Sequence, residues 1–433
     1  MVSTSAGLAF AAVNFLAMVE VAQYMLGDSA WIAILTAGVL CLMAAAVFSE
    51  LTGMRPSAAG IRLWTRLGIS DRFSLGFTLL YLVTVLAVIA ADSFVLAAAI
   101  HAGIPAIPGV VWILMFLTLV LLVNLRGVRP AGLLEDATTF ALLASLVLVT
   151  AVALARGGFR LTTPLAVGPP GNFLQAVALG VFIYVGFEWV TPLAEEVTDQ
   201  RSLPRGMFLA LGVIGVAFAG FSLAMTHFVP QRVLARTLIP QLLVGRTALG
   251  AVGFWWMLAV TAVTAITTFN GSFVSASRLL YALARERSLP RSLGRLNLHF
   301  VPHRALWILW MVSVSMALVV FWSGAYRLLI NAGATLEALM YVVAAWAVIG
   351  LRRRESGAAR PFRFGRGTLG PWATIVVFLG LAAGAATSST GLPLPSVPWT
   401  AVLLAVLALG AIAYVRLGPP AHPPPTQRRP PPA

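Results

Sequence analysis

The stretch Asn172–Met207, NFLQAVALGVFIYVGFEWVTPLAEEVTDQRSLPRGM, decides the fold of this chain. Its first part, residues 173–193, is apolar for long enough to cross a bilayer, which takes about 20 residues. Four residues that a purely lipid-spanning helix would avoid interrupt it: Gly180, Gly186, Glu188 and Pro192. Gly and Pro weaken the helical hydrogen-bond ladder, and freed backbone groups are costly in lipid unless protein, water or ligand satisfies them. We therefore predict a broken helix, near Val185–Glu188, that lines a cavity.

Composition identifies a polytopic membrane protein. The 433 residues are 60% hydrophobic and 10% charged, whereas soluble domains carry about 25% charged residues. The sequence contains no lysine, and most of its arginines stand between apolar runs, so the net charge of +15 does not indicate nucleic-acid binding. The single cysteine, Cys41, lies in an apolar run and is interpreted as a small buried residue, which excludes an intramolecular disulfide and a cysteine-based metal site.

Twelve apolar runs are long enough to be transmembrane helices. Arginines are much more frequent in the segments that lie on the side of the N-terminus, so the positive-inside rule predicts that both termini are cytoplasmic. The N-terminal MVSTSAG lacks the basic region of a signal peptide, so the first run is expected to remain in the protein. The runs, numbered as helices 1 to 12, cover residues 5–26, 30–52, 74–101, 108–125, 133–155, 173–194, 206–227, 249–283, 304–323, 326–349, 371–388 and 397–416.

The opening stretch resembles helix 6 of the amino acid/polyamine/organocation permeases. Members of that family carry an aromatic-rich G-F-[DE] break and an A-E-E hinge that ends in a P-R pair. The matching residues here are Phe182, Tyr184, Gly186, Phe187, Glu188, Ala194, Glu195, Glu196, Leu203, Pro204 and Arg205. By this resemblance, Phe182 and Tyr184 are the aromatic gate and wall of a substrate site, Gly186 opens the backbone between Val185 and Phe187, and Glu188 couples protonation to conformation.

Further motifs extend the resemblance from Glu50 to Phe364. The end of helix 8 follows the family's S-R-x-x-Y-A-x-A-R-x-x-x-x-P pattern, beginning at Ser277. The segment that begins at Asn124 resembles the entry to helix 5, but the lysine that replaces a sodium ion in proton-coupled relatives is Leu142 here. The arginines of 351–365 match an R-R…R-P-F-[KR] loop, and we expect them to anchor the cytoplasmic face and meet anionic lipid.

The resemblance implies a leucine-transporter-type fold. We expect an all-α polytopic membrane protein with 12 transmembrane helices and one transporter domain over residues 1–418. A five-plus-five inverted repeat would cover about 5–155 and 173–349, with two peripheral helices at about 371–416. Residues 419–433 are proline-rich and are expected to form a disordered tail.

Helix 1 departs from the family pattern. Members break this helix with a G-S-G-like run whose amides hold the substrate carboxylate, but no glycine or proline occurs between Leu8 and Leu26. Only one of the two expected interrupted helices is therefore visible in the sequence. Asn14 either bonds across helices or contacts substrate. We expect carboxylates to bind less well here than at a glycine-containing break.

Other polar residues within the spans are candidates for ion coupling. Glu20 and Asp92 are intramembrane carboxylates, which normally face a cavity or a partner. In helix 8, hydroxyl residues recur on one face and either bond back to their own turn or form an ion or substrate path against helix 1. They are Thr264, Thr268, Ser272 and Ser275.

These features predict a secondary transporter for an amino acid or a related organic amine, in the cell membrane of a prokaryote. No G-K-[ST] loop, H-E-x-x-H or Cys/His cluster indicates an enzyme, a cofactor or a metal site. The expected partners are a small-molecule substrate, the lipid bilayer and a coupled proton or sodium ion. Two alternatives remain: a polyamine or organocation transporter, favoured if Glu20, Asp92 and Glu188 face one cavity, and a non-transporting sensor, favoured if a continuous helix 1 plugs the path.

Overall fold

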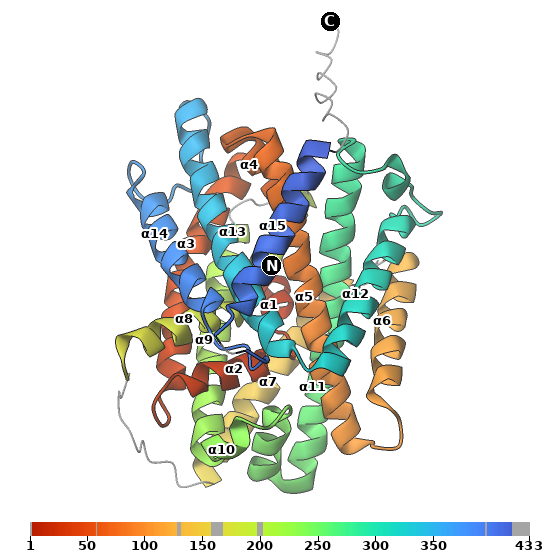
Figure 1. Cartoon of the computed structure of the whole chain (residues 1–433), viewed down its shortest axis with the longest axis vertical. Coiled ribbons are helices and arrows are strands. Elements are labelled where there is room, and N and C mark those ends of the chain that lie inside the picture. Colours follow the sequence, from red (N-terminus) through yellow and green to blue (C-terminus); the bar gives the residue numbers. More distant parts are fainter. Residues whose placement is uncertain are drawn as a thin grey trace, which may run out of the picture.

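The computed structural model describes residues 2–57, 59–127, 131–156, 168–196, 202–394 and 396–417. Over these ranges the regular structure is helical (Figure 1). The elements are α1 (Val2–Ala9), α2 (Asn14–Gln23), α3 (Ala30–Met54), α4 (Ile61–Gly68), α5 (Asp71–Gly103), α6 (Gly109–Leu125), α7 (Ala131–Arg156), α8 (Pro170–Phe182), η1 (Phe187–Glu196), α9 (Ser202–Phe228), α10 (Gln231–Leu234), α11 (Pro240–Arg285), η2 (Arg291–Gly294), α12 (His303–Ser323), α13 (Tyr326–Arg354), α14 (Leu369–Ala386) and α15 (Trp399–Leu417).

Each predicted apolar run overlaps at least one of these helices. Ten helical stretches of the described residues are long and apolar enough to cross a membrane, one of which runs from α8 into η1 (Pro170–Thr191), and α6 is a shorter apolar helix. Two runs differ in their course. The run 5–26 forms two short helices, α1 and α2, instead of one, and α11 begins before residue 249 and kinks at Gly250, where φ is 63°.

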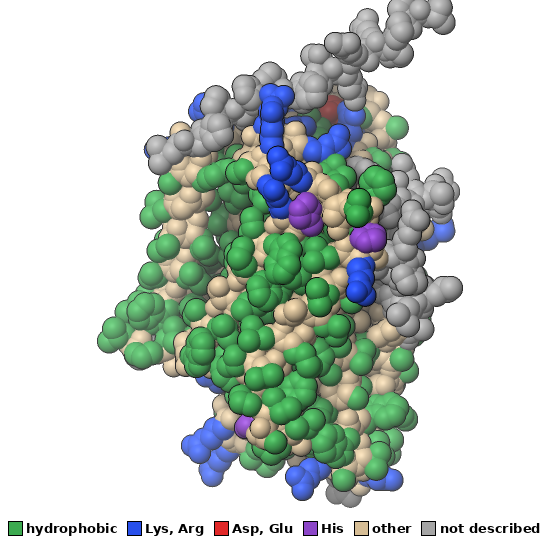
Figure 2. Space-filling view, turned by 90° about the vertical axis from the view of Figure 1, so that its right-hand side faces the viewer, with side chains coloured by type: hydrophobic (Ala, Val, Ile, Leu, Met, Phe, Trp, Pro, Cys, Tyr) green, Lys and Arg blue, Asp and Glu red, His purple; other side chains and the backbone are tan. Residues whose placement is uncertain are grey.

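The surface fits a lipid environment. Figure 2 shows hydrophobic side chains spread over the middle of one face, with arginines toward its ends. Large apolar side chains that are more than half exposed lie on several helices, including Val216, Trp255, Trp322 and Val376. A soluble monomer rarely exposes so much contiguous apolar surface, so the chain is a multi-pass membrane protein.

The helices pack in two groups. The first, here called the bundle, contains α1, α2, α3, α8, η1 and α9, in which α3 packs along α9 and α8 packs on α2 and α3. The second, here called the scaffold, contains α5, α6, α11 and α12, which contact one another. α13 touches both groups, through α3 and α8 on one side and α5 on the other. Any site at the centre of the molecule is therefore formed by both groups and α13.

The two C-terminal helices differ in how peripheral they are. α15 packs on α5 and α13, and most of its surface is exposed, as predicted. α14 packs on α13 and also contacts α8 and α3, so its predicted peripheral placement is only partly right. Cys41 is buried and free, as expected.

A buried ion pair lies at the end of the molecule that carries α4, the upper end in Figure 1. Arg352 Nε of α13 donates to Glu50 Oε1 of α3 at 2.7 Å, and the Phe364 amide donates to Glu50 Oε2 at 2.8 Å. Arg354 donates to the Leu67 carbonyl oxygen at 2.6 Å. The expectation that this arginine cluster meets lipid is wrong for Arg352, because its side chain is buried against Glu50, whereas Arg354 is exposed and its contact with lipid stays a prediction.

Several sequence predictions fall outside the described residues. These are the A-E-E hinge side chains of Ala194, Glu195 and Glu196, and the tail 419–433.

Candidate functional site at two broken helices

The sixth predicted helix breaks where the sequence indicates. α8 ends at Phe182, turns occupy residues 183–186, here called the helix-6 break, and η1 begins at Phe187. Gly186 has a φ of 108°, a conformation that glycine adopts readily and other residues rarely. The predicted break near Val185–Glu188 is confirmed, and Gly186 is the residue that permits it.

The first predicted helix is also broken. α1 ends at Ala9 and α2 begins at Asn14, so residues 10–13 form a second interruption, here called the helix-1 break. α1 packs on η1 and α2 packs on α8, which places the two breaks side by side. The sequence shows only the helix-6 interruption, and the structure adds a second one in helix 1, where groups from α5 and α11 satisfy backbone that the break frees.

Asn14 ties the two breaks together. Its Nδ2 donates to the Ala9 carbonyl oxygen at 2.8 Å and to the Ile183 carbonyl oxygen at 3.2 Å. These carbonyls lie at the end of α1 and in the helix-6 break, and an unsatisfied carbonyl in lipid surroundings costs several kcal/mol. Asn14 therefore bonds across helices, which is one of its two predicted roles.

Asp92 of α5 reaches the helix-1 break from the scaffold. The Val13 amide donates to Asp92 Oδ1 at 2.6 Å, and the side chain is 0% exposed. Thr268 of α11 donates to the Phe10 carbonyl oxygen at 3.4 Å. The helix-1 break is thus held by two scaffold side chains, one that accepts from a freed amide and one that donates to a freed carbonyl.

The predicted aromatic gate residues are buried against neighbouring helices. Phe182 lies against Gly333 of α13. The Tyr184 hydroxyl donates to the Ile34 carbonyl oxygen of α3 at 2.9 Å. Val185, which stands between Tyr184 and Gly186, is also buried. In this conformation the rings of Phe182 and Tyr184 fix the helix-6 break to α13 and α3.

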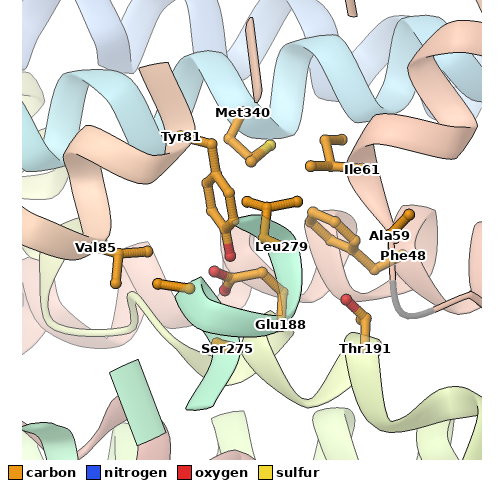
Figure 3. Close-up of a pocket in the computed structure, with 12 residues that line it drawn as sticks. Phe48, Ala59, Ile61, Tyr81, Val85, Glu188, Thr191, Ser275, Leu279 and Met340 are labelled. Atoms are coloured by element: carbon orange, nitrogen blue, oxygen red, sulfur yellow. The ribbon is translucent and has the colours of Figure 1, made fainter. Parts of the chain in front are cut away.

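Glu188 faces a pocket beyond the helix-6 break. The pocket, with the part open to solvent, has about 450 Å³ of empty space, and it is lined by η1, α3, α4, α5, α11 and α13. Figure 3 shows the Tyr81 hydroxyl directed toward the Glu188 carboxyl group, with Ser275 below and Met340 above. Phe187, the residue before Glu188, packs its ring near Tyr341 at a centroid distance of 5.9 Å.

A second carboxyl group, that of Glu337 on α13, lies next to Glu188. Glu188 is 2% exposed and Glu337 is 0% exposed. Neither carboxyl group has a hydrogen-bond partner of good geometry among the described residues. Tyr81, Tyr341 and Cys41 are the other ionisable groups close to this pair, and they come from α5, α13 and α3. Two adjacent carboxyl groups in so apolar a place cannot both carry a charge at low cost.

Glu20 lies apart from the other acidic candidates. Its Oε1 is 2.9 Å from Arg327 Nε of α13, and its side chain is 4% exposed. The three carboxylates Glu20, Asp92 and Glu188 therefore have different partners: an arginine, a backbone amide and a second carboxyl group. The condition that favoured a polyamine transporter, one cavity for all three, is not met in this conformation.

The hydroxyl row of α11 contacts both broken helices. Thr268 donates to the helix-1 break, and Ser275 Oγ donates to the Trp189 carbonyl oxygen of η1 at 3.4 Å. Thr264 and Ser272 are buried, with no hydrogen-bond partner for their hydroxyls in the described ranges. Bonding back to their own turn, one of the two predicted roles, is therefore wrong for these four residues.

Sequence reasoning missed two members of the site. Glu337 was visible as an intramembrane carboxylate, which is a functional candidate by rule, but its pairing with Glu188 depends on how α13 packs on η1. Arg327 stands at the start of α13, and only the folded arrangement shows that it pairs with Glu20. No local signal marks residues 10–13 as a break.

The sequence comparison now has a structural context. The model of the family described as amino acid permease matches residues 1–424. The chain belongs to the amino acid permease family. Its two adjacent broken helices and the carboxylates around them are thus features of a permease.

Individual permeases and transporters give weaker, partial matches. An uncharacterised transporter of Mycobacterium tuberculosis is 31% identical over 208 residues, which cover 45% of this chain and 46% of that protein. The match thus spans about half the length of that relative. The aromatic amino acid transport protein AroP of Corynebacterium glutamicum is 27% identical over 82% of both chains, and the branched-chain amino acid permease BcaP of Bacillus subtilis is 25% identical over 78% of this chain and 76% of its own.

A solved structure supports the fold. The crystal structure of a manganese transporter from Eremococcus coleocola superposes with a TM-score of 0.61, covering 96% of this chain and 94% of that one. The sequence identity is 14%, so this likeness concerns the arrangement of helices alone.

Proposed function

We propose that this permease is a secondary transporter that moves an amino acid or a related organic amine across the cell membrane by alternating access. The observation that carries the proposal is the pair of broken helices joined by Asn14. Broken helices at the centre of a membrane protein present backbone amides and carbonyls to a substrate or ion, and their halves can move separately.

The order of the helices supports a five-plus-five repeat with two additional helices, twelve spans in all. The first repeat, about 5–155, would contain α1 with α2, α3, α5, α6 and α7. The second, about 173–349, would contain α8 with η1, α9, α11, α12 and α13. Elements at matching positions contact each other: α2 with α8, α3 with α9, α5 with α11 and α6 with α12. α14 and α15 then follow within one domain.

We assign substrate binding and gating to the region of the two breaks. It contains Asn14, Val185, Gly186 and Phe187, with Phe182 and Tyr184 as aromatic residues that move when the helix-6 break shifts against α3 and α13. These side chains are buried in the described conformation. Substrate access would therefore require the bundle and scaffold to separate.

Proton coupling is proposed for Glu188 and Glu337. Removal of the last proton from the pair would leave two negative charges in an apolar pocket, which is costly unless water enters or the groups separate. Protonation and movement of η1 relative to α13 would then be linked. The sodium alternative rests on Thr264, Thr268 and Ser272, whose hydroxyl oxygens line one face of α11 beside the helix-1 break.

Orientation follows from charge. We propose that both termini are cytoplasmic, in the plasma membrane of a prokaryote, because arginines concentrate at the end that carries α4. The sensor alternative required a continuous helix 1, and the break at residues 10–13 removes that support. The polyamine alternative loses its condition of one shared cavity. An amine substrate is still compatible with the buried carboxylate of Asp92.

Uptake in proteoliposomes tests the proposal. Purified protein would be assayed with a panel of amino acids and amines under a pH gradient, a sodium gradient or neither. Accumulation driven by one gradient is the expected result. Absence of uptake and of counterflow for every compound, with a protein that shows a cooperative melting transition, would contradict transport.

A further inference from the structure

The carboxylate of Asp92 lies where an open helix end would attract an anion. α2 begins at Asn14, and the amide of the residue before it, Val13, donates to Asp92 Oδ1 at 2.6 Å. Freed amides at a helix N-terminus, together with the helix dipole, favour a negative group. In this chain that group is a side chain of the protein itself, supplied by α5.

The second oxygen of the same carboxylate is unused. Asp92 Oδ2 is buried and has no hydrogen-bond partner of good geometry among the described residues, although the Thr268 hydroxyl and the Ala12 amide lie near the same carboxylate. The ion pairs found in the described ranges do not include Asp92. An acceptor oxygen buried without a donor is costly, so its position beside the two breaks indicates that a ligand supplies the donor.

We infer that the substrate of this site is an organic amine without a carboxylate, whose ammonium group binds Asp92. The inference rests on the proposed transport function and names its substrate class. An amino acid would have to place its own carboxylate beside Asp92, where like charges repel, or displace Asp92 from the Val13 amide. A carboxylate-free amine has neither problem, because its only charge is the ammonium group, which is opposite in sign to the Asp92 carboxylate.

Matched pairs of compounds test the inference. Isoamylamine would be compared with leucine, and phenethylamine with phenylalanine, since each pair shares its side chain and differs in the carboxylate. Binding would be measured as the rise in melting temperature of the detergent-purified protein, and transport as uptake into proteoliposomes. We expect each amine to bind at least about 10-fold more tightly than its amino acid, the equivalent of one charge-assisted hydrogen bond.

Two substitutions separate a substrate contact from a structural cap. Asp92→Asn keeps an oxygen that accepts from the Val13 amide, because Asn caps helices about as well as Asp, but it removes the charge. We expect a loss of amine affinity of about 10- to 100-fold with a melting temperature near that of the parent. Asp92→Ala frees the Val13 amide. In this variant, the ratio of amine affinity to amino acid affinity should be smaller than in the parent.

Ser93→Ala is the matched control. Ser93 is the next residue on α5, and its Oγ donates to the Ile89 carbonyl oxygen of its own helix at 2.7 Å. This variant should keep the parental affinities.

The outcomes are distinct. Tight, carboxylate-dependent binding of an amino acid by the parent overturns the inference and leaves transport standing. Parental amine affinity in Asp92→Asn also overturns it, because Asp92 is then only a cap. If no amine or amino acid binds or is transported, both the inference and the proposed function fail. Asp92→Asn decides the matter even if Asp92→Ala does not fold.

Discussion

The two broken helices reach the same geometry by different means. The helix-6 break carries its cause within itself, because Gly186 takes a φ of 108° and interrupts the ladder locally. The helix-1 break contains Phe, Ala, Ala and Val and no residue with special backbone freedom. It is held open by the side-chain amide of Asn14, the residue that follows it, and from other helices by the Asp92 carboxylate and the Thr268 hydroxyl.

The difference shows that a helix can be broken by backbone freedom or by competing partners. A backbone group leaves the helical ladder at little cost only when another group replaces its lost bond. Gly186 lowers the cost of the distortion, whereas Asp92 and Asn14 supply the replacement bonds. Substitutions at the two breaks should therefore fail in different ways.

The largest effect is expected at the helix-6 break. Gly186→Leu should reduce uptake by about 100-fold or more, because strain of about 1–3 kcal/mol at this backbone conformation adds to the bulk of a side chain placed beside the site. Uptake and melting temperature would both be measured. The control is Gly212→Leu on α9, where no atom lies within 4 Å of an added Cβ. Parental uptake by Gly186→Leu would contradict the role of this residue.

A smaller effect is expected where the breaks are joined. Asn14→Ala leaves the carbonyls of Ala9 and Ile183 without their side-chain donor, and each buried unsatisfied group costs about 1–3 kcal/mol. We expect lower thermal stability and an uptake reduced about 10-fold, equivalent to about 1.4 kcal/mol.

The matched control for Asn14 is Asn124→Ala. This change also removes a buried amide, but the partners of its Nδ2 lie on α6 and α11 and not in either break: the Val120 carbonyl oxygen at 2.9 Å and Asn270 Oδ1 at 2.9 Å. It should lower stability and spare uptake. Equal effects of the two changes on uptake would show that Asn14 acts through stability alone.

The carboxyl pair beyond the helix-6 break should control pH dependence. Glu188→Gln should flatten the change in uptake between mildly acidic and neutral pH, because the variant has one fewer group to lose a proton. Glu337→Gln should do the same, since the two groups share one environment. Initial uptake rates across a pH series would be the measurement. A folded Glu188→Gln protein with the parental pH profile would contradict proton coupling at Glu188. It would favour the sodium alternative at α11.

The smallest effect is expected at Thr268. Its hydroxyl is 3.4 Å from the Phe10 carbonyl oxygen, which is close to the limit of a hydrogen bond. A hydrogen bond of this length contributes little to the stability of the break. Thr268→Val keeps the shape and should change uptake by less than about twofold. A much larger loss, measured with sodium present and absent, would indicate that Thr268 serves an ion and not only the helix-1 break.

The sequence predicted the parts of this molecule that depend on local pattern. Apolar runs located the helices, and Gly186 located the helix-6 break. Both features act on the backbone of the segment that contains them. The helix-1 break was missed because its cause lies 79 residues away in α5. The pairing of Glu188 with Glu337, and of Glu20 with Arg327, was missed for the same reason.

One residue shows how a local rule misleads. Arg352 lies in a run of three arginines at the end of α13, a pattern typical of an anchor at a membrane surface. In the fold it is buried against Glu50, which the sequence placed in another motif. The three arginines correctly predicted where the helix ends, but they did not predict that Arg352 pairs with Glu50.

The ion pair between Glu20 and Arg327 has a kinetic consequence. It joins α2 of the bundle to α13, and its carboxylate is almost fully shielded from water. Dissolved ions screen charges that are exposed far more than charges that are buried, so salt can act on this pair only after it has separated. Raising the ionic strength should therefore leave the rate of opening nearly unchanged and slow the return to the closed form, so that time spent open lengthens with salt.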